Sequence, residues 1–323
     1  MEGRDFSAAA QAYKNAAFAL FILAVFPYGA QYVFTYVFAL LKEATGLDFT
    51  SAKWFEYFMS FAPVYLVGMP LCLLLMRSVP KEDGPVFRLG AKDILTCALI
   101  CFPIMYIGNT IGILSSSLLS AGKATNDVAE LAIESSMIKV IPLVVISPLL
   151  EEFIFRKQLL DRLAIYGEKA AIVFSALAFA LIHGNLYQFF YAFGHGLLYG
   201  YIYIRTRRLR YSVLLHMMVN IIGSVVAPFI LGSISAETLE SFFSGQVSAA
   251  ELMPEMLWYG LFLFAEIALG IGGLFVLKAK LPCIRIYTTK KQLPDEWVLP
   301  IVYCNTGALQ LFLVCGIFIV LSL

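Results

Sequence analysis

Charged residues are scarce in this chain of 323 residues: Asp, Glu, Lys and Arg together make up 14% of the sequence. Soluble globular domains carry about 25%, and 22 acidic and 23 basic residues are too few to cover a soluble protein of this length. Hydrophobic residues reach 60%, and the mean hydropathy is +0.82. This composition excludes a soluble domain and a disordered chain, and it predicts a polytopic membrane protein.

The chain also lacks an excess of either charge and any closely spaced cysteine pair. Its net charge of +1 gives no reason to expect a nucleic-acid partner. The six cysteines form no CxxC pair and lie mostly in apolar runs, which argues against a disulfide scaffold and a cysteine metal site. No cleavage site of small residues follows the first apolar run, so we expect this run to be a retained helix rather than a signal peptide.

Nine apolar runs approach or exceed the roughly 20 residues that a membrane-spanning helix needs. They cover residues 16–41, 58–76, 94–119, 137–155, 170–183, 186–204, 211–231, 256–277 and 299–323. The fifth run is the shortest, so we expect the turn after it, His183-Gly184-Asn185, to lie below the membrane surface and to line a cavity. The sequence therefore predicts an all-α fold of eight or nine transmembrane helices in a single membrane domain, residues 1–323.

Lysine and arginine residues indicate the orientation in the membrane. When the gaps between the apolar runs are numbered from the N-terminal tail, 19 of the 23 basic residues fall in odd-numbered gaps. Basic residues accumulate on the cytoplasmic side of membrane proteins. We therefore expect a cytoplasmic N-terminus, an external C-terminus, and a bacterial plasma membrane as the location.

Two adjacent carboxylates lie near the inner end of the fourth run, where ionisable groups are costly. Glu152 precedes Arg156 by four residues, a helical spacing at which the two side chains pair. Glu151 points about 100° away from that pair and has no partner at helical spacing. A lone carboxylate in a poorly solvated site is suited to general-base catalysis. The alternative is a glutamate pair that reaches into cytoplasmic water.

All three histidines of the chain, His183, His195 and His216, fall within one stretch of 34 residues that follows the glutamates. Phe179 shares a helical face with His183, and His216 shares one with Asn220. An imidazole and a carboxamide on one face can donate hydrogen bonds to a developing oxyanion. Together with a glutamate that activates water, these groups form a complete set for hydrolysis without a covalent nucleophile.

These residues form three ordered motifs, Glu151-Glu152-x-x-x-Arg156, Phe179-x-x-x-His183 and His216-x-x-x-Asn220. Together they resemble the motifs of the CAAX-protease and bacteriocin-processing (CPBP) family of glutamate-dependent intramembrane endopeptidases. The motif region covers residues 137–225, less than a third of the chain. One such motif is common by chance, whereas three in order on consecutive membrane segments are specific.

The resemblance implies a metal-independent endopeptidase without a cofactor that cleaves a lipidated, membrane-anchored or small hydrophobic peptide. It implies that Glu151 activates water, with His183 as a co-activator. It also implies that His216 and Asn220 form the oxyanion hole, and that Glu152, Arg156 and Phe179 support the site. The expected partners are a peptide or lipidated-protein substrate and membrane lipid.

Three other functions stay open at this point. A zinc metalloprotease could use the glutamates and histidines as ligands, although the chain has no HExxH motif. A non-catalytic scaffold or immunity protein could retain the family fold. A secondary transporter could use intramembrane Glu and His as a proton relay, but we find no internal repeat. His195 and Glu266 belong to none of the motifs, and the sequence assigns them no function.

Overall fold

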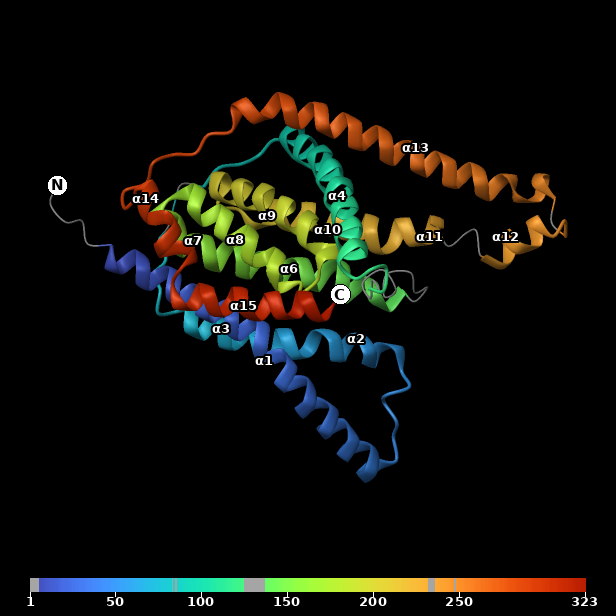
Figure 1. The fold of residues 1–323 in the computed structure, drawn as a ribbon, viewed down its shortest axis with the longest axis horizontal. Helices are drawn as coiled ribbons and strands as arrows, with labels where there is room; N and C mark the ends of the chain where they lie inside the picture. The colour runs from blue at the N-terminus through green and yellow to red at the C-terminus, as the bar shows by residue number, and fades with distance from the viewer. Residues whose placement is uncertain (1–5, 83, 85, 125–136, 232–235, 247) are drawn as a thin grey trace.

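The computed structural model describes residues 6–323 apart from 83, 85, 125–136, 232–235 and 247, and every regular element in the described residues is a helix. Figure 1 shows them as a bundle with α8 and α9 at its centre. The α-helices are α1 (Ser7–Thr45), α2 (Lys53–Ala62), α3 (Met69–Met76), α4 (Ala91–Leu119), α6 (Ser147–Glu152), α7 (Leu159–Leu163), α8 (Glu168–Ile182), α9 (Leu186–Thr206), α10 (Leu209–Ile221), α11 (Ala227–Leu231), α12 (Ala236–Phe243), α13 (Ala249–Lys280), α14 (Asp295–Val298) and α15 (Thr306–Leu321).

Wide π-helical segments join several of these α-helices into longer rods. The π segments are η1 (Pro63–Gly68), η3 (Val140–Ile146), η4 (Phe153–Gln158), η6 (Ile222–Val226) and η8 (Leu299–Tyr303). Three of them end two residues before a proline, at Pro70, Pro148 and Pro228. Proline has no N–H and interrupts the regular i→i−4 hydrogen bonds of an α-helix, and a π-helical turn accommodates the interruption without ending the rod.

Within the residues that the structure describes, five helical rods are long and apolar enough to cross a membrane. They span Ser7–Thr45, Lys53–Met76, Ala91–Leu119, Leu209–Ile230 and Leu252–Cys283, and the pair Asp295–Tyr303 and Thr306–Leu321, bent by 61°, makes a sixth if it counts as one span. The predicted all-α polytopic membrane protein is confirmed. The number of eight or nine spans stays a prediction, because α8 has only 15 residues and short α and π segments divide the helix that carries the two glutamates.

Close helix contacts surround the central helix α9. Gly108 of α4 lies directly against the backbone of Tyr191, and a Cβ atom at this glycine would approach the Tyr191 Cα to 2.5 Å. On the other side of α9, Gly196 lies against Ala176 of α8, where an added Cβ would approach the Ala176 Cα to 2.8 Å. Small residues at these positions let the helices approach closely, and they bring α4 and α8 into direct contact with α9.

The basic loops of the odd-numbered gaps meet at one end of this bundle. Backbone hydrogen bonds connect Glu82 with Asp161 at 2.8 Å, Phe87 with Thr206 at 3.1 Å, and Leu293 with Tyr166 at 3.0 Å. Ion pairs between Arg207 and Asp161 and between Arg205 and Glu168 strengthen the same end. These loops therefore lie on one side, as the distribution of basic residues requires.

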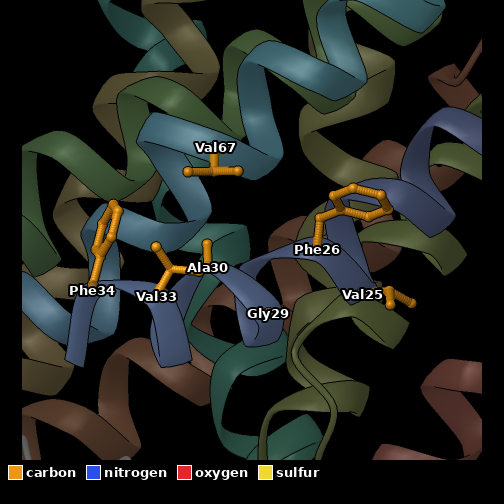
Figure 2. A pocket seen from close by; sticks show the side chains of 7 residues that line it. All are labelled: Val25, Phe26, Gly29, Ala30, Val33, Phe34 and Val67. Carbon is orange, nitrogen blue, oxygen red and sulfur yellow. The ribbon is translucent and has the colours of Figure 1, made fainter. Parts of the chain in front are cut away.

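An apolar groove lies along the second half of α1, beside η1. Figure 1 shows α1 diverging from α2 below the bundle, and Figure 2 shows the groove from close by. Its lining consists of Val25, Phe26, Gly29, Ala30, Val33, Phe34 and Val67. None of the motif residues lines this groove.

Candidate active site

Both glutamates lie at the end of α6, in the middle of one continuous helix built from η3, α6, η4 and α7. Neighbouring side chains on a helix point about 100° apart, so the two carboxylates enter different surroundings. Glu152 is 0% exposed, whereas 22% of the Glu151 side chain is exposed. Of the two, Glu151 is the carboxylate that water can reach.

Glu152 is held on both of its carboxylate oxygens. Arg156 Nε lies 3.0 Å from Oε2, and His216 Nδ1 lies 3.2 Å from Oε1. Arg156 is itself fully buried, donates from Nη1 to Ser175 Oγ at 3.3 Å, and lies over the ring of Phe179 at 4.8 Å from its centroid. The predicted pairing of Glu152 with Arg156 is confirmed, and it joins α6 to α8 and α10 through buried contacts.

Glu151 is held on one oxygen and leaves the other open. Its Oε1 atom accepts a hydrogen bond from Ser147 Oγ, and the hydroxyl of Tyr65 lies 3.4 Å away. Its Oε2 atom lies 3.8 Å from His216 Nε2. The expectation that Glu151 has no partner at helical spacing is therefore wrong, because Ser147 precedes it by four residues, a spacing visible in the sequence.

His183 packs against Phe179, whose ring also contacts His216. Its Nδ1 atom lies 2.7 Å from the carbonyl oxygen of Phe179, and the two rings meet edge to face with centroids 4.9 Å apart. A carbonyl only accepts hydrogen bonds, so Nδ1 carries the hydrogen, and Nε2 of the neutral ring is an acceptor. Phe179 also meets His216 edge to face at 5.8 Å, which places both imidazoles around one aromatic ring.

Asn220 lies beside the helix of the glutamates and donates from Nδ2 to the carbonyl of Leu143 at 2.8 Å. This carbonyl lacks its usual helical donors, because the Ser147 N–H donates to Pro142 and because Pro148 has no N–H. Asn220 supplies the hydrogen-bond donor that this carbonyl lacks within its own helix. One hydrogen of the carboxamide is thus engaged, and a second is left for another acceptor.

His195 lies outside this group. It is 3% exposed, and its Nε2 atom lies 3.2 Å from the carbonyl of Cys101. Its ring stacks on Tyr199 at 5.4 Å, and the ring of Tyr199 lies 5.7 Å from that of His216. One aromatic ring therefore separates His195 from the site, which supports a packing role.

In the part of the chain that the structure describes, no set of three or more His, Cys, Asp or Glu side chains is arranged to hold a metal ion. Nδ1 of His216 and both oxygens of Glu152 are engaged with one another and with Arg156.

Comparison with known families and proteins identifies one segment of the chain. Residues 133–222 match the family model described as "Type II CAAX prenyl endopeptidase Rce1-like". The chain is 25% identical over 170 residues to "Putative membrane peptidase YdiL" of Bacillus subtilis (strain 168). It is 36% identical over 83 residues to "Membrane-embedded CAAX protease MroQ" of Staphylococcus aureus (strain USA300). The matched segment is similar to the CAAX protease family.

This matched segment, residues 133–222, contains all seven motif residues, from Glu151 to Asn220. The alignments with YdiL and MroQ cover 48% and 24% of this chain, and 66% and 34% of the two relatives, less than two thirds of either. No solved structure matches the chain. Tyr65, which contacts Glu151, lies outside the matched segment, and the sequence motifs gave no indication of it.

Proposed function

We propose that the chain is a membrane endopeptidase in which Glu151 activates water for the hydrolysis of a peptide bond. The observation that carries this proposal is the geometry of Glu151. It is a partly exposed carboxylate whose Oε2 atom lies 3.8 Å from the His216 imidazole, whereas the neighbouring Glu152 is paired with Arg156 and His216. The match of residues 133–222 to the Rce1-like CAAX endopeptidase model supports it.

In this mechanism a water molecule lies between Oε2 of Glu151 and Nε2 of His183. Glu151 takes a proton from the water as its oxygen attacks the peptide carbonyl carbon, and the electrons of the C=O bond move to the oxygen. The protonated Glu151 then gives that proton to the leaving nitrogen as the C–N bond breaks. The products are a carboxylic acid and an amine, and the carboxylate of Glu151 is restored.

The tetrahedral intermediate carries a negative oxygen that needs donors. His216 and Asn220 fill this role in our proposal, His216 from Nε2 and Asn220 from the carboxamide hydrogen that Leu143 does not use. Because Nδ1 of His216 already donates to Glu152, donation from Nε2 requires a doubly protonated ring. Glu152, Arg156 and Phe179 hold His216 and His183 in position.

The proposed substrate is a lipidated, membrane-anchored or small hydrophobic peptide, because the site lies among membrane-embedded helices. The family description and the name of MroQ favour a prenylated CAAX tail. We place the protein in a bacterial plasma membrane with its N-terminus in the cytoplasm, an orientation that the basic residues support.

The two buried histidines His216 and His195 provide a matched test of this proposal. Purified variants are assayed on a panel of peptides with and without a C-terminal prenylated cysteine, and products are identified by mass. His216→Ala is expected to reduce kcat by about 10²- to 10³-fold, the effect of losing an oxyanion donor. His195→Ala is expected to retain most of the activity, because its ring contacts Tyr199 and the Cys101 carbonyl rather than the site.

Thermal unfolding of both variants shows whether a lost rate reflects a lost fold. The proposal would be contradicted by a folded His216→Ala protein with the wild-type rate. It would equally be contradicted by a folded His195→Ala protein that is inactive while His216→Ala cleaves normally.

A further inference from the structure

Tyr65 approaches Glu151 from a part of the chain that none of the three motifs includes. It lies on η1, 86 residues before Glu151, and its hydroxyl oxygen lies 2.9 Å from Ser147 Oγ and 3.4 Å from Glu151 Oε1. Its ring stacks on Phe61, one helical turn earlier, with centroids 6.0 Å apart and planes inclined by 9°. Tyr65 is thus fixed by packing on one side and by hydrogen bonds on the other.

The two hydroxyl groups can donate in sequence, Tyr65 to Ser147 and Ser147 to Glu151. An ionised carboxylate only accepts hydrogen bonds, so the single hydroxyl hydrogen of Ser147 is directed to Glu151 Oε1. The Ser147 oxygen is then the acceptor for the hydroxyl hydrogen of Tyr65 at 2.9 Å. The result is a chain from Tyr65 to Ser147 to Glu151.

This arrangement distinguishes the two oxygens of Glu151. Oε1 accepts from Ser147 and lies within reach of Tyr65, whereas Oε2 lies 3.8 Å from His216 Nε2, outside hydrogen-bond distance. Rotation of the carboxylate would break the contact to Ser147. Oε2 is therefore held toward the imidazole of His216.

We infer that Tyr65 and Ser147 form a hydroxyl relay that fixes the carboxylate of Glu151 and selects Oε2 as the oxygen that takes the proton from water. The relay rests on the proposed function, in which Glu151 is the general base. Both are positioning residues: Ser147 acts on Glu151 directly, and Tyr65 acts mainly through Ser147. Fixing the base in a productive geometry lowers the barrier of the chemical step and leaves substrate binding unchanged.

The relay makes a prediction about coupling between the two hydroxyls. Tyr65→Phe, which keeps the ring on Phe61, is expected to lower kcat about 5-fold, and Ser147→Ala about 30-fold, with KM unchanged in both. Because Tyr65 acts through Ser147, the double variant is expected to match Ser147→Ala within about 2-fold, since residues of one network do not add. Ser147→Thr, which retains a hydroxyl, is expected to restore most of the rate.

Tyr32→Phe serves as the matched control. Tyr32 lies on α1 and is 77% exposed, so this substitution is expected to leave kcat unchanged. Additive losses of 5-fold and 30-fold in the double variant would overturn the relay, because two independent packing defects add. So would wild-type kcat in both single variants. Glu151→Gln, assayed in parallel, separates the two claims. If it keeps the wild-type rate, the proposed function fails; if it is inactive while Tyr65→Phe and Ser147→Ala are unaffected, the relay alone fails.

Discussion

Glu151→Gln is expected to reduce kcat for a cleaved peptide by about 10³-fold, within the range measured for removal of a general base. Glutamine has nearly the same shape as glutamate and can still accept a hydrogen bond from Ser147, but it cannot take a proton from water. Because the Glu151 side chain is partly exposed, removing its charge does not leave a buried charged group without a partner. The fold and KM should therefore be retained while turnover is lost.

Glu43→Gln is the matched control for this loss. Glu43 is an exposed residue near the end of α1 and belongs to no described part of the site, so its amide variant should cleave at the wild-type rate. Equal unfolding temperatures of the two variants and the wild type would attribute the difference in rate to chemistry. A Glu151→Gln protein that turns over substrate normally would refute the role of Glu151.

Arg156→Met is expected to lower the free energy of unfolding by about 3–5 kcal/mol, because it leaves the fully buried carboxylate of Glu152 without its main cationic partner. Methionine retains much of the side-chain volume, so the loss reflects charge rather than a cavity. Unfolding of the purified protein in mixed micelles, followed against denaturant, measures the change.

Lys157→Met removes the adjacent charge as a control. The side chain of Lys157 is 45% exposed and lies 3.9 Å from Asp161, so this substitution is expected to cost less than about 1 kcal/mol. The double variant Glu152→Gln with Arg156→Met removes both charges and is expected to recover part of the stability lost in Arg156→Met. Equal stability of Arg156→Met and Lys157→Met would contradict the buried ion pair.

Local spacing predicted the parts of the site that lie on single helices. The i,i+4 step between Glu152 and Arg156 predicted their ion pair, and the step between Phe179 and His183 predicted that both side chains reach the same place. Helical geometry alone determines such contacts. Gly108 and Gly196 lie in close helix contacts for the same kind of reason, since small residues let helices approach each other.

Contacts between distant segments could not be predicted in this way. Tyr65 is one of 17 tyrosines, and its place beside Glu151 depends on how η1 packs against α6. The hydrogen bond from Asn220 to Leu143 likewise depends on a local feature of the helix. The Leu143 carbonyl has no donor within its own helix because a π-helical segment meets Pro148 there. Ser147 differs from these cases, since its i,i+4 spacing to Glu151 was visible and a serine hydroxyl can hold a carboxylate.

Cleavage by the wild-type protein after exhaustive chelation tests the central claim most directly. The protein is treated with chelator, its residual zinc is measured, and the rate on a lipidated peptide is compared before and after zinc is added back. If a glutamate activates water without a metal, the metal-free protein retains the full rate and zinc does not increase it. A metal-free protein that is inactive and regains cleavage with stoichiometric zinc would contradict the account and establish a metalloprotease instead.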